Sequence, residues 1–294
     1  MKEIVVISGK GGTGKTSITA SFAFLAKEDI VVADCDVDAA DMHLLLQPDY
    51  EKSEDFHSGV LAEIDQEKCI KCGKCAEVCR FDAIPKINSQ YIVNPLNCEG
   101  CGYCYHICPT DAILMKEQNV GKCYTSNTRM NNKMVHARLN IGAENSGKLV
   151  AKVKNEAKKI AEKYQKEFVL VDGSPGIGCP VISSLSGADL VVFVTEPTIS
   201  AFHDLRRVYE LVEQFKIQTV CIINKSDLNE TISQEIQEFM RTNKISLLSS
   251  LPYDDSFTKA MIEGKTITEF NDDIKKLLEK SWSEIKQIIG SEVA

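Results

Sequence analysis

The sequence predicts an α/β fold: a mostly parallel sheet with helices on both faces, interrupted by a small cysteine-rich domain. Three observations predict it. Short apolar runs alternate with helical stretches, which is the pattern of a parallel sheet. A glycine-rich loop directly follows the first of those runs. A run of four cysteines occurs twice in the middle of the chain, at the same spacing.

The first 60 residues begin the sheet. Residues 3–8 form an apolar run typical of a buried parallel strand, and residues 16–27 carry apolar side chains at helical spacing. Residues 30–34 are the next apolar run, so this segment predicts a β–loop–α–β unit. Three later apolar runs continue the sheet: 168–172, 190–195 and 219–224.

The cysteine run has the spacing C-x2-C-x2-C-x3-C and recurs 29 residues later. Thiolates at this spacing ligate [4Fe–4S] clusters, and the fourth cysteine of each run binds the cluster of the other run. The sequence therefore predicts two clusters. One is assigned to Cys69, Cys72, Cys75 and Cys108, and the other to Cys79, Cys98, Cys101 and Cys104.

The cysteine runs define an inserted domain over residues 61–117, similar to a bacterial two-cluster ferredoxin. A domain this short has little apolar core, so we expect the clusters to hold it together. The rest, residues 1–60 and 118–294, is predicted to form one discontinuous domain. Residues 116–147 are polar and are interpreted as the returning linker, with one edge element at 135–142.

Composition limits the function classes. The net charge of −8 argues against a nucleic-acid binder, which usually has a basic face. No apolar stretch reaches 18 residues, and the N-terminus lacks the features of a signal peptide. Twelve cysteines at metal-binding spacing, without an export signal, favour metal over disulfides. We therefore expect a cytoplasmic protein in a reducing environment.

The glycine-rich loop matches the phosphate-binding pattern G-x4-G-K-[ST] between a strand and a helix. Its backbone N–H groups are expected to surround the β-phosphate at the helix N-terminus. Lys15 is expected to bridge the β- and γ-phosphates, and Thr16 to bind Mg²⁺. The expected nucleotide-binding residues of the loop are Gly11, Gly12, Thr13, Gly14, Lys15, Thr16 and Ser17.

Lys10 is a second lysine in the loop, and the string KGGTGKT resembles the deviant Walker A motif of the MinD/ParA/Mrp/nitrogenase iron protein family. The resemblance covers essentially all of the chain outside the insertion. It implies a P-loop NTPase fold and a face-to-face dimer closed by ATP, either a homodimer or a heterodimer with a related ATPase. Lys10 would then reach the phosphates of the partner's nucleotide. The alternative is a solvated loop lysine.

Acidic residues follow two of the strands. Asp34, Asp36 and Asp38 lie at the end of the second apolar run, where phosphates and magnesium bind in such sheets. By resemblance Asp36 positions the attacking water, so the implied catalytic set is Lys10, Lys15 and Asp36. Asp172 ends an apolar run as in a Walker B motif and is expected to hold Mg²⁺.

Two further strings point to the nucleotide base. Asn224 and Lys225 open an N-K-x-D string that resembles a base-recognition motif. In GTPases the final aspartate selects guanine, whereas in the MinD-like family the asparagine commonly contacts adenine. The resemblance therefore implies ATP. It also implies that Pro252, Tyr253 and Asp254 flank the base from the other side.

Cys179 lies seven residues after Asp172, in a glycine-rich segment that resembles switch II. The nitrogenase iron protein carries a ligand of its subunit-bridging cluster at this offset. A third, bridging cluster is therefore one reading, and a packed cysteine is the other, because no second ligand is evident. Cys35 and Cys221 are predicted to be core residues.

Two segments remain. The terminal helical pattern around Trp282 is predicted to dock on the body and not to bind a membrane stably, because its polar face mixes both charge signs. The other segment resembles the insertion-bearing subfamily and has no assigned chemistry: His136, Arg138, Asn145 and Lys148.

The leading hypothesis is an ATP-dependent carrier or assembly factor for iron–sulfur or metal clusters, similar to the Mrp branch. It would hydrolyse ATP slowly and serve an apo-metalloprotein. The alternative is an ATP-gated electron donor to a redox client, similar to the nitrogenase iron protein. A positioning ATPase on membrane or DNA is disfavoured by the acidic net charge.

Overall fold

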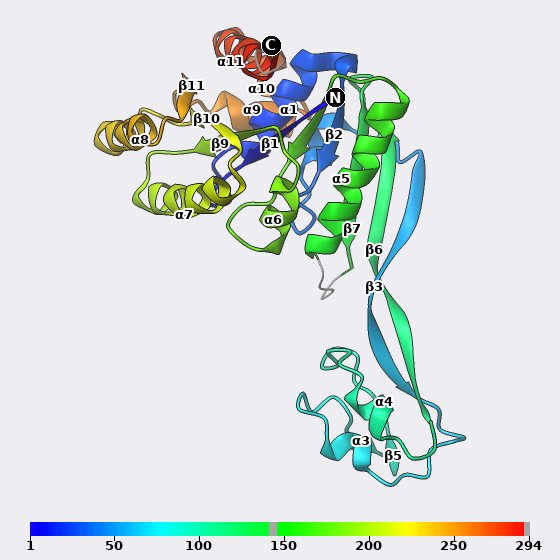
Figure 1. Ribbon diagram of the computed structural model, residues 1–294. Coiled ribbons are helices and arrows are strands. Elements are labelled where there is room, and N and C mark those ends of the chain that lie inside the picture. The colour runs from blue at the N-terminus through cyan, green and yellow to red at the C-terminus, as the bar shows by residue number, and fades with distance from the viewer. Residues whose placement is uncertain (141–145, 291–294) are drawn as a thin grey trace. The chain divides into compact units, whose positions relative to one another are not determined.

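The computed structural model describes residues 1–140 and 146–290 and separates into two compact units, a large and a small one (Figure 1). The domain boundaries expected after residues 60 and 117 fall inside two long strands, β3 and β6. The large unit comprises residues 1–54, 122–138 and those from 146 onward, and the small unit comprises residues 55–121 with Leu139 and Asn140.

The predicted α/β sheet is present. Among the described residues, nine strands join in the order β11-β10-β9-β1-β8-β2-β7-β6-β3. β1 pairs in parallel with β8 and β9, β2 with β8 and β7, and β10 with β9 and β11. The strands are β1 (Lys2–Ile7), β2 (Ile30–Asp34), β3 (Lys52–Ile64), β6 (Ile113–Asn127), β7 (Lys133–Leu139), β8 (Phe168–Asp172), β9 (Leu190–Thr195), β10 (Gln218–Ile223) and β11 (Ser246–Ser250).

Helices cover both faces of this sheet, which explains why its central strands read as continuous apolar runs (Figure 1). One face packs against α1, α2, α10 and α11, whose apolar side chains join those of the strands in a single core. The helices of the large unit are α1 (Lys15–Ala26), α2 (Met42–Leu46), α5 (Ser146–Lys163), α6 (Cys179–Leu185), α7 (Ile199–Phe215), α8 (Glu230–Thr242), α9 (Ser256–Ile262), α10 (Ile267–Phe270) and α11 (Asp272–Gly290).

The prediction that residues 116–147 form a linker is wrong. β6 and β7 occupy most of it, and β7 lies inside the sheet between β2 and β6, so 135–142 is not an edge element. Sheet pairing satisfies the backbone N–H and C=O groups whatever the side chains are, so a polar segment can still be a strand. Residues 141 and 142 lie outside the described residues.

The terminal helix α11 docks on the body of the large unit, as predicted. Ile274, Leu278 and Ile285 are buried in the core, and the Trp282 ring lies 5.4 Å from that of Phe22 in α1. In the described part of the chain, no helix combines the length and apolarity needed to cross a membrane.

Between its portions of β3 and β6, the small unit has little regular structure. It contains the short helices α3 (Lys74–Glu77) and α4 (Tyr103–Ile107) and the two-stranded ribbon of β4 (Lys86–Ile87) and β5 (Gln90–Tyr91). Its buried core is small, and cysteines are part of it or pack on it. The fully buried members are Ala62, Ile64, Ala83, Ile84, Cys104 and Ile113.

Candidate functional site

The predicted phosphate-binding loop joins β1 to α1. Gly12 and Gly14 have φ values of 84° and 89°, in the left-handed region that favours glycine. A side chain at Gly14 would also collide with the amide of Asn224. Because α1 begins at Lys15, the loop presents the free N–H groups of a helix N-terminus, which attract anions.

The structure brings four predicted residues together at the carboxyl ends of β2 and β8: Lys15, Thr16, Asp36 and Asp172. The Lys15 ammonium is buried and lies 2.8 Å from Asp172 Oδ1 and 3.5 Å from Asp36 Oδ2. The Thr16 hydroxyl donates to Asp172 Oδ2 at 2.8 Å. The two predicted magnesium ligands, Thr16 and Asp172, are therefore in direct contact.

Asp34 adds a third carboxylate to this site, where the sequence reasoning placed it without giving it a specific role. It lies opposite Asp172 in the register of β2 and β8. Its Oδ1 accepts the Asp36 N–H at 3.2 Å, whereas its buried Oδ2 has no hydrogen-bond partner among the described residues. Its position as the last residue of β2 was the available signal.

The pKa values follow from this excess of carboxylates. Burial raises the pKa of Asp34 well above its usual range, and the neighbouring Asp172 raises it further. Burial also raises the pKa of Asp36. For Lys15 burial lowers the pKa, but Asp172 and Asp36 outweigh it and the pKa is raised. One ammonium does not balance three carboxylates, so these side chains together carry an excess of negative charge. Binding of Mg²⁺ by Thr16 and Asp172 stays a prediction.

Lys10 is held within its own chain. Its ammonium lies 2.9 Å from Glu196 Oε1 and donates to Ser200 Oγ at 3.1 Å. Glu196 also binds Lys225 Nζ at 2.7 Å, and that lysine donates to the Gly12 carbonyl at 3.0 Å. Sequence reasoning missed Glu196, although it directly follows an apolar strand. The action of Lys10 on a partner's nucleotide stays a prediction.

The predicted base-binding residues lie beside the loop. The buried Asn224 amide donates to the Thr13 carbonyl at 2.9 Å, so it stabilises the conformation of the phosphate-binding loop. Asp227 Oδ1 accepts the Tyr253 N–H at 2.6 Å, which ties the N-K-x-D string to the segment Pro252–Asp254. Contact of these residues with a base stays a prediction.

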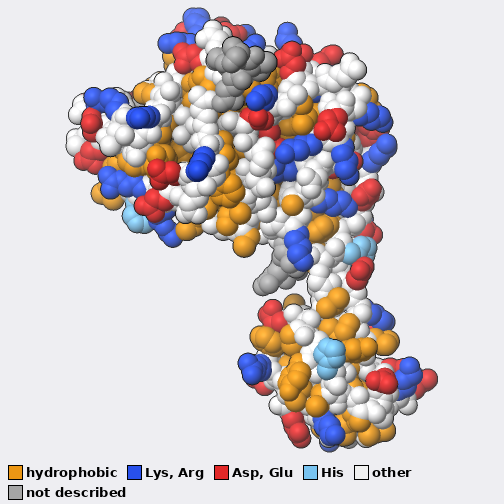
Figure 2. Space-filling view, viewed as in Figure 1, with side chains coloured by type: hydrophobic (Ala, Val, Ile, Leu, Met, Phe, Trp, Pro, Cys, Tyr) orange, Lys and Arg blue, Asp and Glu red, His pale blue; other side chains and the backbone are white. Residues whose placement is uncertain are grey.

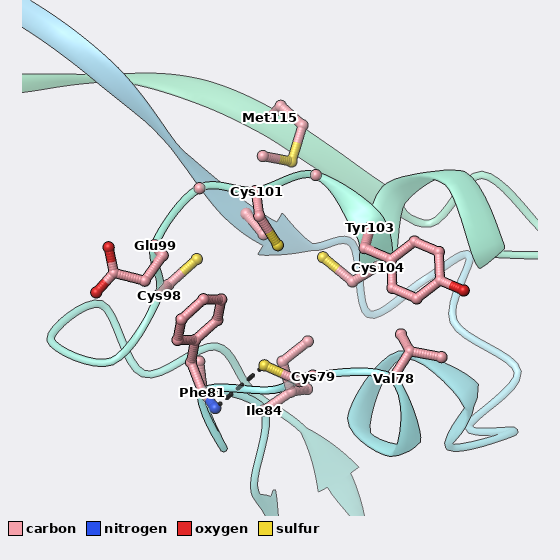
Figure 3. A pocket seen from close by; sticks show the side chains of 14 residues that line it. Val78, Cys79, Phe81, Ile84, Cys98, Glu99, Cys101, Tyr103, Cys104 and Met115 are labelled. Atoms are coloured by element: carbon pink, nitrogen blue, oxygen red, sulfur yellow. Dashed lines mark hydrogen bonds between the residues drawn. The ribbon is translucent and has the colours of Figure 1, made fainter.

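Two pockets in the small unit are each lined by four cysteines. In the pocket of Figure 3 the sulfurs of Cys79, Cys98, Cys101 and Cys104 face a common space, with Phe81 and other apolar side chains around them. The second pocket contains the remaining four cysteines of the two runs: Cys69, Cys72, Cys75 and Cys108. These are the two sets that the sequence spacing assigned to separate clusters.

The last cysteine of each run accepts a backbone hydrogen bond. The Ala83 N–H donates to Cys79 Sγ, and the Ala112 N–H donates to Cys108 Sγ, both at 3.3 Å. Burial raises the pKa of Cys108, but backbone N–H groups outweigh it and the pKa is lowered. Such bonds stabilise a thiolate, the form that binds metal. Each pocket thus offers a donor set suited to a four-iron cluster.

No three His, Cys, Asp or Glu side chains of the described residues stand close enough to hold a single metal ion. The four sulfurs of each pocket are therefore not arranged around one ion. Cluster binding in the two pockets stays a prediction.

The other cysteines differ in exposure. Cys35 and Cys221 are buried, as predicted, and burial raises the pKa of both thiols. Cys123 is buried in β6, where its pKa is raised to about 11. Cys179 is exposed at the first residue of α6. A bridging cluster at Cys179 stays a prediction.

The polar residues without assigned chemistry lie in different environments. His136 is buried in β7, stacks on Tyr124 and lies 2.9 Å from Ser126 Oγ. Burial lowers its pKa to about 4. Arg138 and Lys148 are exposed, and Asn145 lies outside the described residues.

A buried ion pair was not predicted. Lys154 of α5 lies 2.6 Å from Glu3 Oε1, and both side chains are almost fully buried. The same ammonium donates to the carbonyls of Ser184 and of Ser186, the latter at 2.9 Å, at the C-terminal end of α6. It therefore neutralises a buried carboxylate and caps the helix that follows the switch II-like segment.

Comparison with known proteins agrees with this geometry. Residues 4–267 match the CobQ/CobB/MinD/ParA nucleotide-binding domain family. The chain belongs to this family. Its fold is therefore that of a P-loop ATPase.

Individual relatives span the whole chain. The uncharacterized protein MJ0578 of Methanocaldococcus jannaschii is 34% identical over 98% of this chain and 97% of its own length. A second protein of that organism, MJ0579, is 27% identical over 92% and 93%. The septum site-determining protein MinD of Pyrococcus horikoshii, solved with Mg-ADP, superimposes with a TM-score of 0.57 at 17% identity, covering 99% of this chain and 98% of that one. At that identity the likeness concerns the fold.

Proposed function

We propose that this protein is an ATPase whose nucleotide-driven dimer cycle is coupled to two [4Fe–4S] clusters in its inserted segment. One observation carries the proposal: two pockets of the small unit are each lined by four cysteines, drawn from both runs. Three come from one run and the fourth from the other, as two-cluster ferredoxins require. The large unit contributes the nucleotide site.

The nucleotide site is proposed to act through the residues gathered around the loop. The loop N–H groups and Lys15 bind the phosphates of ATP, while Thr16 and Asp172, which are in contact, would hold Mg²⁺ beside them. Lys15 then exchanges its contact with Asp172 for the β- and γ-phosphates. Asp36 orients the water that attacks the γ-phosphorus, and ADP and phosphate leave. In the dimer, with a second copy or a related ATPase, Lys10 leaves Glu196 and stabilises charge on the partner's nucleotide.

The cysteines of the two pockets would hold the clusters, and bound clusters would accept and release single electrons. Backbone N–H groups at Cys79 and Cys108 stabilise the thiolates. The apolar walls, among them Phe81 and Met115, limit the access of water.

The leading role is delivery of an iron–sulfur or metal cluster to an apo-metalloprotein. The exposed position of Cys179 supports it, because this thiol begins the helix that follows the switch II-like segment. A thiol at this position can bind the cluster to be delivered, and its environment changes when the switch II-like segment moves with the nucleotide state.

The second candidate is electron donation to a redox client, gated by ATP. The hydrogen bonds to the sulfurs favour it, since such bonds adjust reduction potentials of centres that stay in place. Both pockets provide complete sets of four ligands, which suits resident centres.

The deciding experiment is the iron content of anaerobically purified protein, together with transfer to an apo-acceptor. Two resident clusters predict about eight irons per chain, and a bridging cluster shared by a dimer adds about two. Iron that falls from ten to eight in Cys179→Ala, with loss of transfer, supports the carrier. Eight irons in both, with ATP-dependent reduction of an acceptor, support the donor.

The control variant is Cys221→Ala, which removes a buried thiol of β10 far from either pocket in sequence. It should leave the iron content unchanged. An iron content near zero after anaerobic reconstitution would overturn the proposal for both candidates.

A further inference from the structure

A lysine-rich cleft lies in the large unit, away from the nucleotide site. It has a volume of about 170 Å³ and forms where the last turns of α5 face the beginnings of β3 and β7. Its lining includes four lysines and two glutamates: Lys52, Lys133, Lys159, Lys163, Glu51 and Glu156.

The cleft is at the opposite edge of the sheet from the phosphate-binding loop. Lys133 begins β7 and lies opposite Val31, near the start of β2, whereas Asp34 ends β2 beside Asp172. Parallel strands place their carboxyl ends at one edge, where the P-loop lies, and their amino ends at the other. A ligand in this cleft is therefore separate from the nucleotide.

The charges of the cleft are not balanced internally. Glu51 binds Lys133 at 3.0 Å and also accepts the Asn127 amide at 3.2 Å. Glu156 binds Lys159 at 3.1 Å. Within the described residues, neither Lys52 nor Lys163 has a carboxylate at ion-pairing distance. The lining thus carries two uncompensated positive charges in a chain whose net charge is −8.

The aromatic ring of Tyr164 positions part of this charge. The ammonium of Lys133 lies 5.8 Å from the centre of the ring and that of Lys163 lies 5.2 Å from it. Cation–π contact at these distances holds lysine side chains that would otherwise extend into water. Figure 2 shows Lys and Arg side chains gathered over the face that α5 forms.

We propose that this cleft binds a compact, multiply charged anion. Lysine ammonium groups are common phosphate ligands and also bind carboxylates. The cleft volume is small against the 300–1,000 Å³ of typical ligand pockets, which suits a phosphate ester or a small polycarboxylate better than a nucleotide. The proposal goes beyond the ATPase cycle and does not depend on the clusters.

The test is calorimetric titration with pyrophosphate and, separately, citrate, at low ionic strength and without magnesium. The chain carries Lys15→Ala so that the P-loop does not capture the probe. The expected result is one saturable site per chain that weakens at least tenfold when Lys52→Gln and Lys163→Gln are added. Binding should also weaken as salt is raised, because exposed charges are screened.

The matched control adds Lys276→Gln and Lys280→Gln instead, which remove two exposed charges from α11 and should leave affinity unchanged. Binding of pyrophosphate alone identifies a phosphate ester, and equal binding of citrate identifies a polycarboxylate. The proposal is overturned if neither probe saturates or if both lysine pairs have the same effect. Trp282 fluorescence confirms that each variant is folded.

Discussion

The two units of this protein achieve order by different means. The large unit buries an apolar core that runs from Ile4 in β1 to Ile289 in α11. The small unit buries few apolar residues, and cysteines line both of its pockets. Large apolar side chains such as Leu96 and Ile70 are exposed at 85% and 63%. Figure 2 shows hydrophobic side chains over much of the visible surface of this unit. Apolar burial therefore specifies the first unit, whereas the second buries too little apolar surface for the same explanation, and the clusters of the proposed function would supply what is missing.

The largest effect is expected from removing iron. Anaerobic chelation should unfold residues 65–112 and leave the sheet of the large unit intact, because the small core cannot compensate for loss of the clusters. Hydrogen exchange by mass spectrometry measures both units at once. Protection of residues 69–108 that survives chelation would contradict the comparison.

Loss of the P-loop lysine should affect the large unit alone. Lys15→Ala is expected to reduce ATP hydrolysis at least about 100-fold, because the ammonium no longer binds the phosphates. Iron content should stay at the wild-type value, since the cysteines lie in the other unit. A parallel loss of iron would show that the units are not independent in cluster binding.

A cavity in the core of the large unit tests whether apolar burial stabilises that unit. Leu278→Ala removes a fully buried side chain of α11 and should lower the free energy of unfolding by about 3 kcal/mol. Urea unfolding followed by the single Trp282 measures it. Lys276→Ala, on an exposed face of the same helix, is the control and should have little effect.

The smallest effect concerns pH. His136 is buried and its pKa is lowered to about 4, below the unfolded value of about 6.5. The unfolded chain therefore binds the proton first, and stability that is present above pH 6.5 is lost as the pH falls toward 4. Between pH 7 and pH 5 the loss should be about 2 kcal/mol for the large unit.

His136→Gln should flatten this dependence when unfolding is followed by Trp282 fluorescence at both pH values. An equal loss of stability in the variant and the wild type would assign the pH effect to other groups. Asp34 and Asp36, whose pKa values are raised by burial, act in the opposite direction, because the folded state then binds their protons more tightly than the unfolded chain does.

Sequence reasoning succeeded where one local pattern decides the structure. The strands 30–34, 168–172 and 190–195 were predicted at their observed bounds, because parallel strands covered on both faces are apolar throughout. β3 and β6 were missed, because their side chains are largely polar. They form strands because they pair with each other in the sheet. Neither segment has a periodic pattern of apolar residues that would predict this pairing.

The same distinction applies to the candidate site. Lys15, Thr16 and Asp172 belong to motifs, and their side chains are in contact in the structure, whereas their roles toward ATP and Mg²⁺ stay predictions. Glu196 and Lys154 make contacts to residues far away in the sequence, with Lys10 in one case and Glu3 in the other. Their roles depend on how distant strands and helices meet, which a single sequence does not reveal.

The adjacency of β3 and β6 has a consequence for how such a protein could arise. The chain leaves the sheet through β3 and returns through β6, and these strands are hydrogen-bonded neighbours. Once they pair, the ends of the segment between Ile64 and Ile113 are already close together, so its length adds little to the entropy of closing the loop. At this edge of the sheet, evolution or a protein engineer can therefore exchange one inserted segment for another without disturbing the pairing of β3 and β6.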